Sequence, residues 1–383
     1  MKSPYFNSDH ALFRQSLADF LNKEIKPHFK QWEEERHIPR WVWEKVGEMG
    51  YLGLYHEEKY GGMQADLFYS VVFLEELGRA GNAGFGAALA VHSYMALNHI
   101  ARAGSDALRE KYLRPGIMGK LIGALAVSEP GAGSDVQKLR TTAVLDGDDY
   151  VVNGSKTFIT NGYYADFITT LVKTENGFSL LVIDGNAEGV TRTKLEKMGW
   201  HSSDTAELAF DNVRVPKSNL VGEEGHGFYY VMDSFQLERL SLAYCGIGAM
   251  DECIRLTLKY MQEREAFGRK IAKFQVLRHK LAELATDVEA CRQLVYHTTW
   301  LYSQGEFAVK EATMCKLKAS ELQKRVVDEC LQMFGGYGYM EEYPLAQFYR
   351  DARVGTIVGG TSDIMREIIA KMVIDAVAYE TQY

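Results

Sequence analysis

The spacing of apolar residues changes twice along this chain, from a helical period to a strand period and back again. Up to about Ala103, apolar residues such as Leu17 and Leu21 recur every three or four positions, which is typical of helices. Around Leu121, short β-branched runs separated by turn residues take over. From Gly227 to the end, long amphipathic stretches return. This α, β, α order excludes a chain of alternating βαβ units.

The same order divides the chain into three units, since 383 residues exceed what one hydrophobic core usually organises. We predict a mainly α protein with a central β domain. An N-terminal helical domain is expected over residues 1–120, with helix breaks at Pro27, Pro39 and KYGGMQ and a last helix that ends near Pro115. An antiparallel β domain is expected over 121–226 and a C-terminal helical domain over 227–383, broken at GRKIAKF, SQGEF and FGGYGYMEEYP.

Two hairpins are predicted in the β domain. TTAVL and YVVNG flank a DGDD turn, and FITTLVKT and FSLLVI flank ENG. A dinucleotide-binding βαβ unit is excluded, because GAGSDV lacks the third glycine of that fingerprint and is followed by strands.

Charge and composition exclude several function classes. Lys and Arg number 43 against 51 Asp and Glu, so the net charge of −8 provides no basic field for nucleic acid. The longest apolar stretch, Ala83 to Val91, is about half of what a membrane-spanning helix needs. The five cysteines form no CxxC pair or zinc-like spacing, and the N-terminal residues show no export or transit pattern. We expect a soluble, cytoplasmic protein with reduced core cysteines, no metal, no nucleic-acid partner and no integral membrane segment.

One carboxylate interrupts an apolar helix face. At 100° per residue, Glu238 falls close to one line with Val231 and Leu242. Such a carboxylate is either paired or has a raised pKa, because burial disfavours its charged form. Glu238 is therefore a candidate general base, and the alternative is a structural salt bridge to an arginine elsewhere.

Three glycine-containing segments have compositions that let the backbone approach a ligand closely. SEPGAGSD, residues 128–135, is either a ligand-binding loop or an ordinary turn. QMFGGYGY, residues 332–339, either cradles phosphates through its N–H groups or ends a helix. In IVGGTSDIMREI, Thr361 is a helix N-cap, and the helix start either binds an anion or is simply capped.

Taken together, five segments resemble motifs of the acyl-CoA dehydrogenase family, in the right order and along nearly the whole chain. They are LAVSEPGAGSD (125–135), NGSKTFITNG (153–162), REAFG (264–268), QMFGGYGY (332–339) and GGTSDIMRE (359–367). The resemblance implies the fold of that family, with a four-helix bundle as the C-terminal domain, noncovalently bound FAD and a homotetramer. GFYYVM and HKLAELATD are most similar to the long-chain and isovaleryl-type subgroup.

The resemblance also implies roles for individual residues. Those placed against the isoalloxazine ring are Leu125, Val127, Ser128, Phe158, Ile159 and Thr160, and Ser134 lies beside the cofactor at the thioester arm of acyl-CoA. Those that reach the FAD of a neighbouring subunit are Arg264, Phe267, Gln275, Gln332, Met333, Phe334, Gly335 and Gly336. Thr361 and Asp363 correspond to positions at the local diphosphate, where an amide or a longer acidic side chain is commoner than Asp.

One departure from the family pattern concerns the base. Many members carry the catalytic glutamate where this chain has Gly359. The chain then resembles either a member without dehydrogenase chemistry or the subgroup whose base lies in an ER pair on the helix before the bundle. QLERLSLA matches that pair at Glu238 and Arg239, so Glu238 is expected to be the base. Arg239, Gly359 and Gly360 are expected to border the substrate.

The implied reaction is α,β-dehydrogenation of an acyl-CoA thioester to the trans-2-enoyl-CoA in fatty acid or related lipid metabolism. Glu238 takes the α-proton, while the Gly359 N–H and a flavin ribityl hydroxyl stabilise negative charge on the thioester oxygen. The electrons pass to an electron-transferring flavoprotein. The alternatives are an acyl-CoA oxidase that uses oxygen, a hydroxylating relative that lacks the base, and an inactive member that acts as a structural or binding protein.

Overall fold

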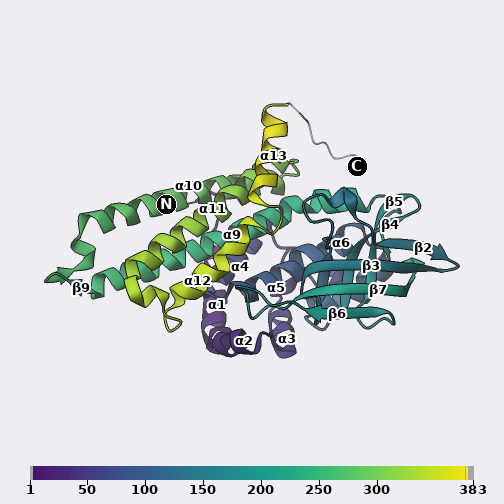
Figure 1. Ribbon diagram of the computed structural model, residues 1–383, viewed down its shortest axis with the longest axis horizontal. Coiled ribbons are helices and arrows are strands. Elements are labelled where there is room, and N and C mark those ends of the chain that lie inside the picture. Colours follow the sequence, from purple (N-terminus) through teal and green to yellow (C-terminus); the bar gives the residue numbers. More distant parts are fainter. Residues whose placement is uncertain (1–2, 376, 378–383) are drawn as a thin grey trace.

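The computed structural model describes residues 3–375 and 377, and it has three parts that follow the chain order (Figure 1). The first part is helical. Its helices are α1 (Ser8–Phe20), α2 (Phe29–Glu35), α3 (Arg40–Glu48), α4 (Leu67–Ala80), α5 (Ala83–Val91), α6 (Leu97–Ala103), α7 (Asp106–Leu108) and α8 (Arg114–Ile117).

The predicted breaks in this part are confirmed at Pro39 and KYGGMQ, and the last helix ends at Ile117, near Pro115. The break predicted at Pro27 is wrong, because the chain stays helical from α1 into α2. A π-helical turn over Leu21–Ile25 is followed by a 3₁₀ turn with Pro27 in its first positions, where the missing N–H of proline is not needed.

The second part is a sheet with strand order β6-β7-β3-β2-β4-β5-β8, to which β1 is added beside β4. Its strands are β1 (Gly123–Ala126), β2 (Thr142–Asp146), β3 (Asp149–Thr160), β4 (Phe167–Thr174), β5 (Gly177–Asp184), β6 (Val190–Lys194), β7 (Thr205–Pro216) and β8 (Leu220–Val221). The two predicted hairpins, β2–β3 and β4–β5, are confirmed.

The predicted antiparallel domain is confirmed for most of its strand pairs, and the sheet also contains two parallel pairings, of β1 and of the start of β2 with β4. A parallel pair needs a long connection between its strands, and the β2–β3 hairpin supplies one between β1 and β4.

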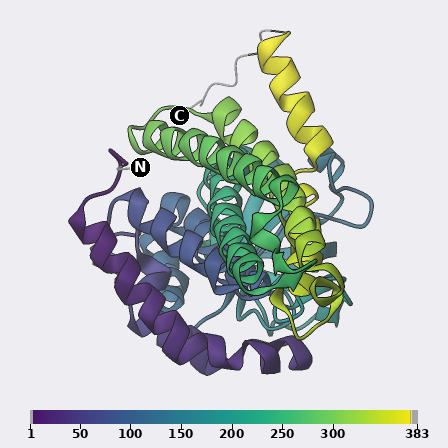
Figure 2. The same ribbon diagram turned by 90° about the vertical axis from the view of Figure 1, so that its left-hand side faces the viewer.

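The third part is again helical. It consists of α9 (Gly227–Glu263), a small hairpin of β9 (Glu265–Ala266) and β10 (Arg269–Lys270), α10 (Gln275–Ser303), α11 (Val309–Phe334), α12 (Pro344–Ala352) and α13 (Ser362–Val373). Three of the four breaks between these helices fall at the predicted segments, and the fourth lies between α12 and α13. Helix α9 packs against α11 on one side and α4 on the other, so one hydrophobic core joins the two helical parts. Helix α13 packs on α11 and projects from the body (Figures 1 and 2).

The cysteines lie where the sequence predicts. Cys253, Cys291, Cys315 and Cys330 are buried, Cys245 is half-buried, and all five are free thiols. Burial raises the pKa of Cys291 to about 11, which keeps this thiol protonated and unreactive. In the described part of the chain, no helix is long and apolar enough to cross a membrane, and no group of side chains is suited to holding a metal ion.

Candidate active site

Glu238 lies at the start of the fourth turn of α9, on the part of that helix enclosed between the two helical domains. Its side chain is 5% exposed, and its Oε1 atom has no hydrogen-bond partner among the described residues. Burial raises the pKa of Glu238 to about 8, although the charge of Arg239 opposes the shift. No salt bridge from Glu238 to an arginine is present in residues 3–375, so the structural alternative left open by the sequence is not what the fold contains.

Arg239 points away from its neighbour, because successive side chains on a helix diverge by about 100°. It is buried between α9 and α11, where its Nη1 donates a hydrogen bond to Thr313 Oγ1 at 3.0 Å. Its guanidinium also lies over the ring of Phe235, at 5.5 Å from the centroid. Arg239 therefore fastens the Glu238 segment of α9 to α11.

The turn formed by Gly359 and Gly360 lies against the same face of α9. Both glycines have positive φ, 63° and 92°, which L side chains rarely adopt. A Cβ on Gly359 would lie 3.0 Å from Cδ1 of Leu242, which is one helical turn beyond Glu238. The Gly359 N–H has no hydrogen-bond partner in the described residues. A free backbone donor and a free carboxylate oxygen thus flank one segment of α9.

Polar groups continue on the other side of Glu238. Ser234, one turn before it, accepts a hydrogen bond from Asn98 Nδ2 at 3.3 Å, and Asn98 Oδ1 accepts one from the Tyr55 hydroxyl at 2.7 Å. Asn98 lies in α6, just after the π-helical turn His92–Ala96. Both α6 and this turn pack directly against α9, so their residues border the Glu238 region.

The residues expected against the isoalloxazine ring gather at β1 and the end of β3. Leu125, Val127, Ser128 and Thr160 are partly exposed, and the Thr157 N–H donates to the Ser128 carbonyl at 2.9 Å, which holds the two segments side by side. Phe158 has a φ of 61° and is 73% exposed, so its ring stands free of the sheet.

Ile159 differs from the other residues of this group. Its side chain is buried in the core of the sheet, and only its backbone is available to a ligand. The cause is a bulge in β3 between Lys156 and Ile159, which turns Phe158 outward and Ile159 inward.

A buried ion pair that the sequence analysis missed holds these segments in place. Lys156 Nζ donates to Glu129 Oε1 and to the Val127 carbonyl, both at 3.0 Å. Glu129 also accepts hydrogen bonds from the backbone N–H groups of Arg140 and Thr141. The sequence did contain a signal for this pair, because Glu129 and Lys156 both lie inside the quoted motifs and Lys156 occupies a buried position of β3.

The loop after Glu129 is open. A Cβ added to Gly131 or Gly133 would meet no atom within 4 Å, and Ser134 is exposed. This loop follows directly on the partly exposed end of β1, which the Thr157 N–H ties to the segment that bears the exposed Phe158 ring.

A second group of predicted residues lies at the opposite end of the molecule. β9 marks this end in Figure 1, far from the sheet. Arg264 lies with its guanidinium 5.7 Å from the Tyr337 ring centroid, which brings the REAFG and QMFGGYGY segments together. Gln275, Gln332, Gly335 and Gly336 are exposed nearby, and Phe267 is 95% exposed. Met333 and Phe334 have side chains in the core, so they offer only backbone groups to a ligand.

Thr361 and Asp363 lie at the start of α13. The Thr361 hydroxyl accepts the Ile364 N–H at 3.2 Å, which confirms the predicted N-cap. The Asp363 carboxylate is almost fully exposed and lies 3.7 Å from Arg366, so it does not face the interior.

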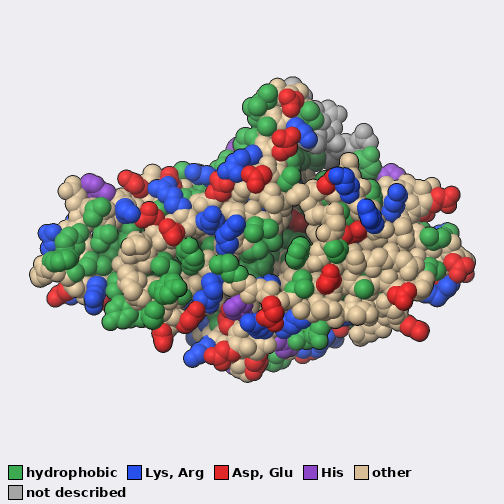
Figure 3. Space-filling model, viewed as in Figure 1, with side chains coloured by type: hydrophobic (Ala, Val, Ile, Leu, Met, Phe, Trp, Pro, Cys, Tyr) green, Lys and Arg blue, Asp and Glu red, His purple; other side chains and the backbone are tan. Residues whose placement is uncertain are grey.

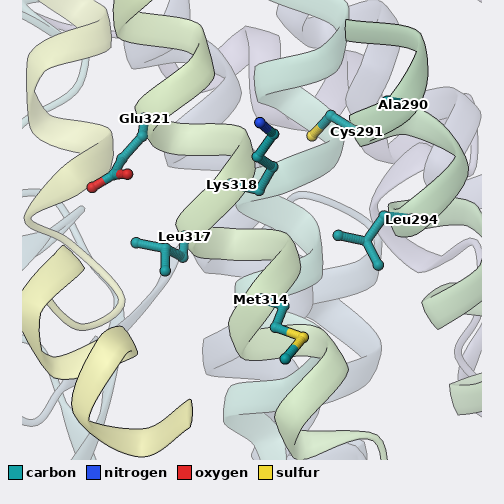
Figure 4. Close-up of a pocket in the computed structure, with 7 residues that line it drawn as sticks. All are labelled: Ala290, Cys291, Leu294, Met314, Leu317, Lys318 and Glu321. Carbon is teal, nitrogen blue, oxygen red and sulfur yellow. The ribbon is translucent and has the colours of Figure 1, made fainter. Parts of the chain in front are cut away.

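A groove on the surface of the third part lies outside this site. It measures about 360 Å³, lies between α10 and α11, and has a mainly apolar lining (Figure 4). The lining residues are Ala290, Cys291, Leu294, Met314, Leu317, Lys318 and Glu321. None of them was predicted as a site residue.

Known proteins resemble the chain over its whole length. Residues 7–120, 124–213 and 225–374 match the N-terminal, middle and C-terminal domains of acyl-CoA dehydrogenase. The mitochondrial long-chain specific acyl-CoA dehydrogenase of Mus musculus is 41% identical over 377 residues, which cover 96% of this chain and 87% of the mouse protein. The mitochondrial isovaleryl-CoA dehydrogenase of Pongo abelii is 36% identical over 368 residues, which cover 94% of this chain and 87% of the Pongo protein.

A crystal structure of acyl-CoA dehydrogenase from Geobacillus kaustophilus matches with a TM-score of 0.94 and 43% identity, over 97% of this chain and all of the other. The predicted resemblance and three-part fold are confirmed.

Proposed function

Because the chain belongs to the acyl-CoA dehydrogenase family, whose members are FAD-dependent oxidoreductases, we propose that it converts an acyl-CoA thioester to the trans-2-enoyl-CoA. Glu238 is the base in this proposal. The observation that carries the proposal is the state of Glu238, a buried carboxylate with an unpartnered oxygen and a pKa of about 8. A base with a pKa near the working pH is the most effective.

The residues at β1 and β3 fit FAD. The exposed Phe158 ring, the partly exposed side chains of Leu125 and Thr160 and the open loop at Gly131 offer a flat surface with polar edges. FAD, when bound there, supplies the acceptor for the hydride that leaves the β carbon. Ile159 contributes through its backbone, since its side chain lies in the sheet core.

The chain's own residues act on the thioester. Glu238 removes the α-proton, and negative charge then develops on the thioester oxygen, where a preorganised donor has its largest effect. The unpartnered N–H of Gly359 is the donor that we assign to it. Gly360 and Arg239 complete this wall of the site, with Arg239 acting through the segment of α9 that it fastens. Ser134, on the open loop, is assigned to the thioester arm.

Two finer points belong to the same proposal. Electrons are passed to an electron-transferring flavoprotein, and the protein works in the cytoplasm. Retention of the base distinguishes the chain from the hydroxylating relatives. An acyl-CoA oxidase remains the second candidate, and turnover in air without an added acceptor would favour it.

The experiment that tests the proposed function is an anaerobic titration of the purified protein with a panel of acyl-CoA thioesters. The protein is expected to be yellow, to release one FAD per chain on denaturation, and to lose flavin absorbance with at least one member of the panel. A folded protein that stays colourless with added FAD would overturn the proposal.

The pH dependence of the reaction is expected to follow the Glu238 carboxyl. Because its pKa is about 8, the base is mostly protonated at pH 7, and kcat/KM should rise about tenfold between pH 7 and pH 9. The same carboxyl stabilises the folded state below its ordinary pKa of 4.5, and this contribution is lost as the pH rises to about 8. Steady-state kinetics and melting curves over pH 5 to 9 measure both trends. A flat kcat/KM profile would contradict the assignment.

We also propose that the protein is a homotetramer in which Arg264 and the Gln332 to Gly336 segment complete a neighbour's FAD site. Their distance from the sheet within one chain supports this arrangement (Figure 1). So do the hydrophobic side chains seen at this end, on the left in Figure 3. Phe267 and Tyr339, which belong to the REAFG and QMFGGYGY segments, are 95% and 79% exposed. An exposed aromatic cluster of this kind is typical of a protein interface.

Arg264→Ala is expected to weaken FAD retention severalfold, because it removes a cation that offsets diphosphate charge. FAD per chain after gel filtration measures the effect, and Arg255→Ala, which breaks only a surface pair with Glu252, is the control. A fully active monomer in sedimentation velocity would contradict the arrangement.

A further inference from the structure

Lys316 is a buried lysine on α11 that none of the recognised motifs contains. Its side chain is 1% exposed, and its ammonium donates a hydrogen bond to the Gly360 carbonyl at 2.5 Å. Burial, reinforced by the charge of Arg239, lowers the pKa of Lys316 to about 8. A buried ammonium is unfavourable unless it is hydrogen-bonded, so the bond to the Gly360 carbonyl offsets part of the cost of burying Lys316.

The contact falls on the turn opposite Glu238. Two successive glycines leave this turn with many accessible backbone conformations, since neither carries a Cβ. Lys316 restrains it directly, because its Nζ donates to the Gly360 carbonyl. The Lys316 stem and Leu242 of α9 both border the space beside Gly359 that a Cβ would occupy.

Helix α11 therefore holds both halves of the site from neighbouring positions. Thr313 binds Arg239 and so fixes the Glu238 segment of α9. Lys316, three residues further and on the same face of α11, fixes the turn that carries the free Gly359 N–H. One helix thus contacts both the segment that carries the base and the turn that carries the donor.

We propose that Lys316 is a positioning residue for the reaction, which keeps the Gly359–Gly360 turn in the conformation that aims the Gly359 N–H at the thioester oxygen. This inference rests on the proposed function and extends it to a residue outside the substrate pocket. A backbone donor contributes to the transition state only if it is fixed before the reaction begins. Loss of the restraint should therefore slow proton removal and leave substrate binding largely intact.

The test compares Lys316→Met, which keeps an apolar stem without a donor, with Lys316→Gln, which keeps an uncharged donor. Lys324→Met, at an exposed lysine on the same helix, is the matched control. Two quantities are measured in each protein. The first is the rate of flavin reduction at saturating acyl-CoA, together with KM. The second is the exchange of the acyl α-hydrogen in D₂O, with the flavin kept reduced so that only proton removal is observed.

Lys316→Met is expected to lower both rates by about 10- to 100-fold, a fraction of the loss on deleting an oxyanion donor, with KM changed less than about threefold. Both rates of Lys316→Gln should lie between those of Lys316→Met and of wild type, and both rates of Lys324→Met should equal those of wild type. If Lys316→Met does not fold, an intermediate loss in Lys316→Gln supports the proposal and wild-type rates overturn it. Wild-type rates in Lys316→Met, or a change in KM alone, would also overturn it. A wild-type protein that neither exchanges the α-hydrogen nor reduces flavin with any acyl-CoA would instead refute the proposed function.

Discussion

Glu238→Gln is expected to bind FAD and acyl-CoA and to reduce flavin at least about 10²-fold more slowly than wild type, the usual scale of general-base catalysis. Glutamine keeps the shape and the polar head of the side chain, but its amide does not accept a proton at neutral pH. The substitution acts on a buried carboxylate whose Oε1 has no hydrogen-bond partner among the described residues. Anaerobic stopped-flow absorbance with the best acyl-CoA of the panel measures the effect.

Glu252→Gln provides a control on the same helix, because the Glu252 carboxylate pairs with Arg255 near the surface. This variant should stay within about twofold of the wild-type rate, as surface substitutions usually do. A wild-type rate in Glu238→Gln would mean that a different group takes the proton. The pH profile of Glu238→Gln should also lose the rise between pH 7 and pH 9, since its titrating carboxyl is gone.

Lys156→Met should destabilise the protein by about 3 kcal/mol or more and lower its FAD content, because it leaves the buried Glu129 carboxylate without its counter-charge. Burial by itself would raise the pKa of Glu129, yet the hydrogen bonds from Thr141 and Arg140 and the charge of Lys156 lower it. The variant thus retains a charged group in an apolar interior, between the two segments assigned to the flavin. Urea unfolding and FAD release measure the two effects.

The double variant Lys156→Met/Glu129→Gln should recover part of the lost stability, since it removes the uncompensated charge. Lys138→Met is the matched control, because Lys138 pairs with Asp135 on the exposed side of the same loop and the change should cost less than about 0.5 kcal/mol. Equal unfolding free energies for Lys156→Met and Lys138→Met would show that the buried Lys156–Glu129 pair stabilises the fold no more than the exposed Lys138–Asp135 pair does.

The parts of the fold that depend on local pattern were predictable. Helical and alternating periods located the three parts, and the turn residues in DGDD and ENG located both hairpins, because these signals lie within a few residues of one another. The parallel pairing of β1 with β4 was not predictable from local pattern, since it depends on contacts between residues more than 40 positions apart. The π-helical turn that carries the chain past Pro27 has no distinct sequence signal either.

The residues of the candidate site also differ in whether the local sequence is enough to identify them. Glu238 could be proposed from a single helix, because one carboxylate in an apolar stripe is visible without knowledge of its surroundings. Lys316 interrupts a similar stripe, between Ala312 and Ala319, and the same reasoning applied to α11 would have found it. Glu129 and Lys156 required knowledge of the partner, since neither is unusual in isolation. Ile159 was assigned by motif position, and only the bulge in β3 shows that its side chain points inward.

The narrow fit of Gly359 against Leu242 also constrains how such an enzyme can change over evolutionary time. A glutamate at position 359 would need a strained backbone and a displaced Leu242, so a single mutation there does not transfer the base from α9 to the turn. Sterics therefore favour a lineage that enlarges the space around Leu242 first, while Glu238 still supports activity, and that loses Glu238 last. Ancestral sequences in which a smaller residue at 242 precedes any acidic residue at 359 would show this order.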